Sequence, residues 1–505
     1  MKRLTAKIAV LVLAPAVAVA ACVSAPYPEQ PPDPSSSAIP LSAYYDQDLD
    51  WQSCGGEFEC ARLSVPKDYE DASAGDFQID IVRLPSTGDQ RQGSLVVNPG
   101  GPGGSGVEYA RAAAHSVSGQ VRQSYDIVGF DPRGVGGSDP VDCVTDSELD
   151  SFIAADGAPS NPQEAEDLAE MAKEFGRDCA ATSPDSYKYM GTDSVARDLD
   201  ILRAVLGDDK LNYLGKSYGT LIGETYLKLF ADKVRRMVLD GVLPPDLTSE
   251  QVHLDQAVGF EQELRRFVRY CQRRLSCPLP KGSVNKGVAS IQRFLKDLRA
   301  NPIKAERDRP LTESLAAGAI LYYLYAPFYG DWDELSAGLA PAFRGDGSKL
   351  MKMLDRRLDR SSDGQYQDNS IEAFYAVTCL DRAAESDLAV LAKREKEWAK
   401  IAPTFGASVA WSDLVCGQWP TPPTGKPFKV DGAGAGPILV VSPTRDPATP
   451  LKWARRVVSQ LTDGHLITWN ADGHTAYMNG SACVDRAVND YLLTGRGPKN
   501  DPRCE

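Results

Sequence analysis

Histidine is scarce in this 505-residue sequence, which has four, and its eleven cysteines show no Cys-x-x-Cys spacing. A metal centre is therefore not expected. Clusters of basic residues are also lacking, and a formal net charge of −14 means that the chain would repel nucleic acid and anionic membrane surfaces. Beyond residue 21, no segment is apolar for long enough to cross a bilayer. We expect a protein without a metal, an organic cofactor or a nucleic-acid partner.

The first 21 residues have the pattern of a secretory signal, with three basic residues ahead of an apolar run over residues 8–21. This segment leads into Val-Ala-Ala-Cys, which is similar to the lipobox of bacterial lipoproteins and predicts that Cys22 is the lipidated first residue of the mature protein. Residues 22–40 are rich in proline and serine and are expected to form an extended tether. We expect the protein on the outer face of the cell membrane, attached by its lipid only; ordinary signal cleavage and secretion is the alternative.

Ten cysteines follow Cys22, and an even number in an exported chain indicates disulfide bonds. Sequence alone does not fix their connectivity. The simplest arrangement joins sequence neighbours, giving Cys54–Cys60, Cys143–Cys179, Cys271–Cys277, Cys379–Cys416 and Cys483–Cys504.

Strand and helix patterns alternate along residues 41–245 and again along residues 420–505. Short apolar strands such as those in GSLVVNPGG and YDIVGFDPRG suit a parallel sheet covered by helices on both faces. Residues 246–419 have mainly helical patterns and interrupt this alternation. We predict an α/β fold with a mostly parallel central sheet, built from two parts of the chain and carrying a large helical cap.

A serine lies between two glycines in Gly-Lys-Ser-Tyr-Gly, residues 215–219, which is the G-x-S-x-G pattern of a nucleophile elbow. In such an elbow the chain passes from a strand into a helix so sharply that the glycines are needed to avoid a clash. The strand pattern KLNYLGKS up to Ser217 and the helix pattern YGTLIGETYLKLFADK after it fit that geometry. The motif is short, so an ordinary serine in a glycine-rich stretch is the alternative.

A nucleophilic serine needs a base, and an acid that orients the base. In the α/β-hydrolase fold the acid and then the histidine follow the serine along the chain. His474 is the best candidate base because it lies in a glycine-hinged loop between the last strand and the last helix. Of the other histidines, His115 precedes the elbow, His253 begins the helical region and His465 begins a strand. Asp446 ends the strand ILVVSPTRD and is the expected acid; a helix N-cap is its alternative role.

The oxyanion of acyl transfer needs two backbone N–H donors. One is expected from Tyr218, the residue after the serine, and the second from the glycine-rich loop of residues 98–106, with Gly101 as the candidate. This loop lacks the Lys-Ser/Thr ending and the G-x-G-x-x-G spacing of phosphate-binding loops. We expect Arg133 and Asp131 to support the loop; a purely structural ion pair is the alternative.

The stretches NPGGPGGSG, GFDPRGVGGSD, GKSYGT, SPTRDPATP and ADGHTAY, with a cysteine-flanked C-terminal helix, resemble exported tripeptidyl aminopeptidases of actinobacteria. These are serine hydrolases of the α/β-hydrolase fold, related to proline iminopeptidases. The resemblance covers residues 41–505 and is weak through the cap. It implies Ser217 as nucleophile, Asp446 as acid and His474 as base. Proline iminopeptidases usually carry His-Gly-Gly-Pro-Gly in the oxyanion loop, whereas Pro99 stands in the histidine's place here, which favours the tripeptidyl branch.

These features predict an exported serine exopeptidase that acts on peptides, releasing short pieces, with tripeptides foremost, from free N-termini through an acyl-enzyme. A carboxylesterase or lipase with the same three residues is the alternative, because a fold does not fix a substrate. A non-catalytic binding protein of the same fold is a third hypothesis, and it would be expected to lack one of the three residues.

An enzyme that recognises a free N-terminus needs a carboxylate at a fixed distance from the nucleophile. The stretch SIEAFYAVTCLDRAAE in the cap offers Glu372 and Asp381, and a Cys379–Cys416 bridge would hold it in place. We expect the substrate ammonium group to bind there; two solvent-exposed acids on a helix are the alternative.

Overall fold

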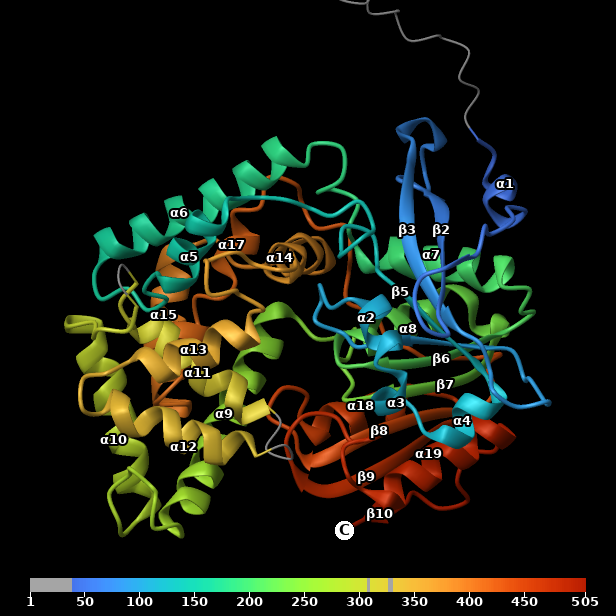
Figure 1. The fold of residues 1–505 in the computed structure, drawn as a ribbon. Helices are drawn as coiled ribbons and strands as arrows, with labels where there is room; N and C mark the ends of the chain where they lie inside the picture. Colours follow the sequence, from blue (N-terminus) through green and yellow to red (C-terminus); the bar gives the residue numbers. More distant parts are fainter. Residues whose placement is uncertain (1–38, 307–308, 326–329) are drawn as a thin grey trace, which may run out of the picture. The chain divides into compact units, whose positions relative to one another are not determined.

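The computed structural model describes residues 39–306, 309–325 and 330–505 (Figure 1). The expected signal segment, the lipidation site Cys22 and nearly all of the expected tether lie outside the described residues. Residues 39–505 cluster as one compact unit. Within the described part of the chain, no helix combines the length and the apolar character that a bilayer span needs.

A ten-stranded sheet forms the centre of the fold, in the order β1-β2-β3-β5-β4-β6-β7-β8-β9-β10. The strands are β1 (Gln52–Ser53), β2 (Glu59–Pro66), β3 (Asp76–Leu84), β4 (Ser94–Asn98), β5 (Asp126–Phe130), β6 (Leu211–Lys216), β7 (Val234–Asp240), β8 (Ile438–Arg445), β9 (Gly464–Asp472) and β10 (Arg503–Cys504). Pairs among β1, β2, β3 and β5 are antiparallel, and every pair from β5 through β4 to β10 is parallel. The predicted mostly parallel sheet is confirmed.

Helices cover both faces of this sheet because successive strand residues point to opposite sides. On β4, Val96 belongs to the apolar core shared with α7 (Thr192–Val205), α8 (Tyr218–Phe230) and α18 (Leu451–Gln460). Its neighbours Leu95 and Val97 belong to the opposite core. Helices on that side are α2 (Gly106–Arg111), α3 (Ala113–Ser116), α4 (Gly119–Ser124) and α19 (Ala482–Thr494), while α1 (Leu41–Tyr45) precedes the sheet.

The expected helical cap has an apolar core of its own, in which side chains such as Phe267, Leu324 and Leu354 are fully buried. Its helices are α9 (Ser249–Gln272), α10 (Val284–Ala300), α11 (Glu313–Tyr325), α12 (Asp331–Ala342), α13 (Ser348–Arg357), α14 (Ser370–Asp381), α15 (Leu388–Ile401), α16 (Gly406–Val409) and α17 (Leu414–Gly417). These helices lie between β7 and β8 in the chain, so the cap is an insertion between two parts of one sheet.

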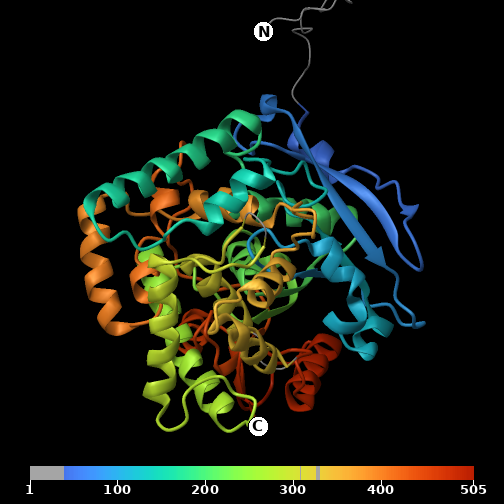
Figure 2. The same ribbon diagram turned by 60° about the vertical axis from the view of Figure 1, so that its left-hand side comes forward.

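Two further helices, α5 (Asp146–Ala154) and α6 (Pro162–Thr182), extend the cap beyond the boundary at residue 246 that the sequence suggests. Ala172 of α6 is buried in one cluster with Leu391 and Trp398 of α15. Figures 1 and 2 both show α6 running alongside the cap helices. The segment between β5 and α7 therefore contributes to the cap, although it precedes the elbow in the sequence.

The structure contains the five expected disulfide bonds, with the same pairings of sequence neighbours. The Cys143–Cys179 bond ties the chain after β5 to the end of α6, and Cys379–Cys416 ties α14 to α17. Both bonds thus join segments that build the cap.

Candidate active site

Ser217 is the single residue between β6 and α8. Its backbone has φ 54° and ψ −126°, a conformation that residues with a side chain rarely adopt. A Cβ atom on Gly215 would lie 2.4 Å from the carbonyl oxygen of Gly219, so the strand and the helix pass too closely for any larger residue. These are the features of a nucleophile elbow, and they favour that interpretation over an ordinary serine in a glycine-rich loop.

His474 and Asp446 are hydrogen-bonded to each other across the ends of β9 and β8. The Nδ1 atom of His474 lies 2.8 Å and 2.9 Å from the two carboxylate oxygens of Asp446. Asp446 also accepts bonds from the N–H of Thr449, at 2.8 Å, and from its hydroxyl, at 2.9 Å. Helix α18 has Pro450 as its N-cap, so the alternative role of Asp446 as the N-cap of that helix does not apply.

The second ring nitrogen of His474, Nε2, is buried and has no hydrogen-bond partner among the described residues. A buried ring nitrogen without a partner is costly in a resting structure and is therefore typical of a functional position. Thr449, whose hydroxyl also lies 3.2 Å from His474 Nδ1, was not identified from the sequence. The stretch SPTRDPATP contains it, but a threonine three residues after an acid carries no signal on its own.

Asp240, the last residue of β7, contacts both the elbow and the histidine loop. Its carbonyl oxygen accepts a 2.9 Å bond from the backbone N–H of Ser217. Its carboxylate accepts 2.9 Å bonds from the N–H groups of Ala476 and Tyr477, and burial raises the pKa of this carboxyl. A Cβ atom on the next residue, Gly241, would lie 3.1 Å from Cε1 of the His474 ring. The end of β7 thus brings the serine backbone and the histidine ring to adjacent positions.

The glycine-rich loop after β4 lies directly against the elbow. A Cβ atom on Gly100 would lie 2.9 Å from both the Cβ atom of Ser217 and the backbone nitrogen of Tyr218. The N–H of Gly100 donates to the side-chain oxygen of Asn98 at 2.9 Å. Tyr218 is the first residue of α8, so its N–H has no partner within the helix. The two expected oxyanion donors, Tyr218 and Gly101, are thus on segments that contact each other beside the serine.

The expected support of this loop comes from Asp131 but not from Arg133. Asp131 accepts bonds from the hydroxyl of Ser105, at 2.6 Å, and from the N–H of Val107, at 3.1 Å, where the loop becomes α2. Arg133 is fully buried and forms a bidentate ion pair with Asp198 of α7 instead. Arg133 therefore forms a purely structural ion pair, which was the alternative to a role in supporting the loop.

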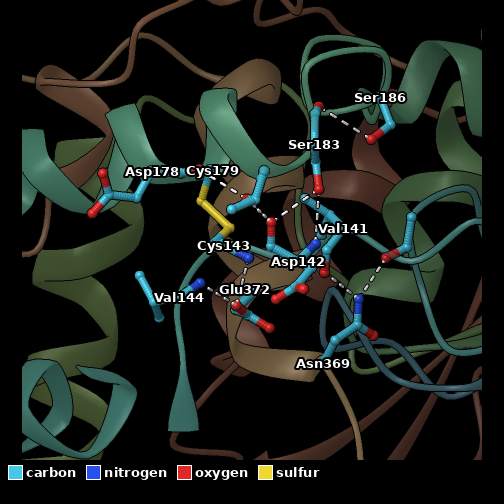
Figure 3. The surroundings of a disulfide bond; sticks show 12 residues. Val141, Asp142, Cys143, Val144, Asp178, Cys179, Ser183, Ser186, Asn369 and Glu372 are labelled. Atoms are coloured by element: carbon cyan, nitrogen blue, oxygen red, sulfur yellow. Dashed lines mark hydrogen bonds between the residues drawn. A yellow bond between two sulfur atoms is a disulfide. The ribbon is translucent and has the colours of Figure 1, made fainter. Parts of the chain in front are cut away.

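The two carboxylates expected to bind a substrate ammonium group have structural partners. Glu372 is buried, and its Oε1 accepts bonds from the backbone N–H groups of Cys143, at 2.8 Å, and Val144, at 3.1 Å (Figure 3). Asp381 accepts bonds from the N–H and the hydroxyl of Thr192, at 2.8 Å and 2.6 Å, and burial raises its pKa to about 6. Glu372 is therefore a buried acceptor and Asp381 a half-buried one; both accept hydrogen bonds from the fold, and neither is a fully solvent-exposed acid.

A cavity of about 320 Å³ lies within the cap beside the histidine. Its walls come from α9, α11, α14 and the segment of residues 405–416, and aromatic side chains are prominent among them: Phe260, Tyr322, Tyr325, Phe374, Tyr375 and Phe405. The ring of Tyr325 meets the ring of His474 edge to face, with their centroids 5.6 Å apart. At the start of α14, a Cβ atom on Gly103 of the glycine-rich loop would lie 2.3 Å from the carbonyl oxygen of Ser370. Two helices that line the cavity, α11 and α14, therefore also contact His474 and the glycine-rich loop.

The cap helix α9 packs against the loop that carries Asp446. A Cβ atom on Gly259 would lie 2.3 Å from the carbonyl oxygen of Pro447, so the helix backbone touches this loop directly. The amide of Gln256 donates to the carbonyl oxygen of Ala448 at 3.1 Å. The position of the acid thus depends on the cap as well as on β8.

Further along α9, Arg266 bridges the cap and the histidine loop. Its guanidinium lies 3.2 Å from Glu263 on the same helix and 3.2 Å from Asp472, two residues before His474. Glu263 is fully buried and one of its oxygens has no partner among the described residues. Burial raises the pKa of Glu263 to about 8. An arginine of the cap, paired with a buried glutamate, therefore contacts the loop that carries the base.

The remaining histidines have other surroundings. His253 lies 3.2 Å from Asp413 in the wall of the cavity, and His465 lies 3.1 Å from Asp463 at the start of β9. His115 is exposed on α3. None of the three contacts the elbow in the part of the chain that the structure describes.

Comparison with known families gives two matches. Residues 93–341 match the model of the alpha/beta hydrolase fold, and residues 402–504 match the model named TAP-like protein. The serine protease Hip1 of Mycobacterium tuberculosis is 34% identical over 91% of this chain and 91% of that protein. The chain belongs to the tripeptidyl-aminopeptidase-like family of α/β hydrolases.

Other members of this family have different names. The tripeptidyl aminopeptidase of Streptomyces lividans is 32% identical over 90% of this chain and 86% of that protein. Carboxylesterase B of Mycobacterium tuberculosis is 35% identical over 94% of this chain and 93% of that protein. As a member of the tripeptidyl-aminopeptidase-like family, this protein is a serine hydrolase.

Proposed function

We propose that the protein is a serine peptidase in which Ser217 is the nucleophile, His474 the general base and Asp446 the acid that orients the histidine. The observation that supports this most strongly is the His474–Asp446 hydrogen bond, which leaves the buried Nε2 atom of the same ring without a partner among the described residues. Ser217 itself has the strained backbone of an elbow. The three residues occur in the chain order of α/β hydrolases.

In the proposed reaction, Nε2 of His474 takes the proton of the Ser217 hydroxyl as the oxygen attacks the scissile carbonyl carbon. Asp446 holds the Nδ1 proton and stabilises the imidazolium that forms. The histidine then gives the proton to the leaving amine, and a water molecule hydrolyses the acyl-enzyme with the same base. We assign the N–H groups of Tyr218 and Gly101 to the negative oxygen of each tetrahedral intermediate.

We further propose that the enzyme releases short peptides from free N-termini. The name of the Streptomyces lividans relative supports this specificity, and so does the size of the cavity, because about 320 Å³ suits a few residues rather than a long chain. The N-terminal segment of the sequence supports export and attachment through a lipid on Cys22. A Cys22→Ser variant is expected in the medium or unprocessed, and membrane retention of a processed variant would contradict the lipid anchor.

The test compares three substrates: a tripeptidyl p-nitroanilide with a free amino group, its N-acetylated form and p-nitrophenyl butyrate. We expect kcat/KM for the free-amine substrate to exceed that of the acetylated one by ten-fold or more. Equal rates for the two would contradict exopeptidase specificity, and Ser217→Ala should abolish every rate.

Carboxylesterase activity is the second candidate, and one observation favours it. Asp413 is the only carboxylate among the described residues that line the cavity, and its charge is already matched by Arg394 at 2.7 Å. A cavity without a free carboxylate suits an acyl group without an ammonium. Hydrolysis of the ester together with inertness toward both peptides would establish this candidate.

A further inference from the structure

Among the described residues that line the cavity of the cap, Arg382 is a cation without an ion-pair partner. Among the described lining residues, the ionisable side chains besides tyrosine are His253, Arg382 and Asp413. Asp413 is bonded to Ser249, to His253 and to Arg394 of α15, which hold its pKa at about 2 against the effect of burial. The charge of this aspartate is therefore cancelled by its own neighbours, and Arg382 is left to determine the charge of the cavity.

Arg382 follows the last residue of α14 and is only 9% exposed. Its guanidinium donates two long bonds, both of 3.3 Å, to the carbonyl oxygens of Leu247 and Pro244. Its Nη1 atom makes no hydrogen bond to the described residues, and none of their carboxylates lies within salt-bridge distance of it. Burying a cation without a counter-charge is costly, and burial accordingly lowers the pKa of this arginine.

Asp381 and Glu224 attract the charge of Arg382 from a distance, but neither forms an ion pair with it. The Asp381 carboxylate is directed to Thr192, as described above. Glu224 of α8 is fully buried, neither of its carboxylate oxygens has a partner among the described residues, and burial raises its pKa well above the usual range. Arg382 thus lies in the wall of a largely aromatic cavity without an ion pair to any carboxylate of the described residues.

We propose that Arg382 is a specificity-determining residue that binds a carboxylate of the substrate's acyl portion. The substrate class is then an acidic one: a peptide with a glutamate or aspartate side chain near the scissile bond, or an acyl group derived from a dicarboxylic acid. A guanidinium–carboxylate pair in a water-poor cavity is strong and can be bidentate. The same charge disfavours lysine or an α-ammonium group at this wall. This inference rests on the proposed function, because it assigns the cavity to the acyl side of the Ser217 reaction.

The experiment measures kcat/KM for tripeptidyl p-nitroanilides in which one position at a time carries Glu, Gln or Lys and the other two carry Ala. We expect the wild-type enzyme to prefer Glu to Gln by about ten-fold at one position, the size of a charge-assisted hydrogen bond. Arg382→Met should bring that ratio close to one, and Arg382→Lys should leave an intermediate ratio. The matched control is Arg455→Met, which removes an exposed arginine of α18 and should leave the ratio unchanged.

A parallel series of esters separates the two proposals and the two sources of the carboxylate. The p-nitrophenyl monoester of glutarate is compared with p-nitrophenyl butyrate on the same variants. If neither peptides nor esters are hydrolysed, the proposed function fails. If substrates are hydrolysed but wild type shows no preference for the acid, or prefers Lys, only the role of Arg382 is overturned. The wild-type profile and the Arg382→Lys variant keep the test decisive should Arg382→Met fail to fold.

Discussion

The backbone N–H of His474 donates a 2.7 Å hydrogen bond to the carbonyl oxygen of Tyr325, the last residue of cap helix α11. A residue of the core loop is thereby fixed by the end of a cap helix, and the Tyr325 ring meets the histidine ring as well. The cap thus does more than enclose a cavity, because it contributes to the position of the proposed base.

The first prediction concerns the assignment of the base. His474→Ala and Ser217→Ala should each lower kcat by several orders of magnitude, since removing either member of a Ser-His pair costs on the order of a million-fold in subtilisin. Far-ultraviolet circular dichroism should be unchanged. His465→Ala is the control, and its turnover should stay close to that of wild type because this histidine pairs with Asp463 at the start of β9. Equal, large losses from both histidine variants would show that the base is wrongly assigned.

The second prediction concerns Asp240, which holds the histidine loop by two backbone N–H groups. Asp240→Asn replaces one acceptor oxygen by an NH2 group that faces those donors. We expect a loss of about 2 kcal/mol in stability, since hydrogen bonds to charged groups contribute about 1.5–3 kcal/mol. We also expect a lower kcat with little change in KM, because the loop positions His474. Thermal unfolding and steady-state kinetics measure the two effects.

The control is Asp490→Asn on the exposed side of α19, which should change neither quantity. Full stability and kcat in Asp240→Asn would show that the loop is held by other contacts.

The elements that were predictable from the sequence are those with a short, local sequence pattern. The elbow needs glycines at fixed spacing, and buried parallel strands are short apolar runs, so Ser217 and its flanking β6 and α8 were predictable. The pairing of Asp446 with His474 followed from their order in the chain and from their places after the last strands. The disulfides followed from the proximity of neighbouring cysteines.

Roles that depend on partners from distant parts of the chain were not predictable from the sequence. In the sequence, Glu372 is an acid on a helix and could be either exposed or part of a binding site. Its partners in the structure are the N–H groups of Cys143 and Val144, 229 and 228 residues away. The amphipathic pattern of α6 shows that one face is buried and does not show that the cap covers it. The residues around Arg382 in the sequence do not show whether this arginine is exposed to water or buried without a counter-charge.

The third prediction concerns the disulfide bonds. Removing Cys143–Cys179 by a double alanine substitution should cost about 4 kcal/mol, from the loss of a loop closure that spans 36 residues. Removing Cys54–Cys60, which spans 6 residues, should cost about 2 kcal/mol. Urea unfolding without a reductant measures both, and peptide mass spectrometry of the unreduced wild type should find five bridges. A smaller cost for the long loop than for the short one would contradict the loop-closure account.

The last prediction uses the buried acid of the cap. Burial raises the pKa of Glu263 to about 8 from 4.5, and the nearby Asp472 and Asp446 add to the rise although Arg266 opposes it. An acid with a raised pKa binds its proton more tightly in the folded state, so the unfolded chain holds fewer protons between pH 4.5 and about 8. The contribution of Glu263 to the free energy of unfolding is therefore fully present below pH 4.5, and it is lost as the pH rises through that window.

Glu263→Gln removes the ionisation while its side-chain oxygen still accepts a bond from Arg266. The melting temperature of this variant should accordingly rise relative to wild type as the pH goes from 5 to 9, by several degrees over that range. Glu397→Gln, an exposed position on α15, should show a pH-independent difference. Because the charges of Glu263 and Asp446 interact, the pH dependence of kcat should also lose a component near pH 8. A parallel shift of melting temperature at every pH would mean that Glu263 does not titrate in this window.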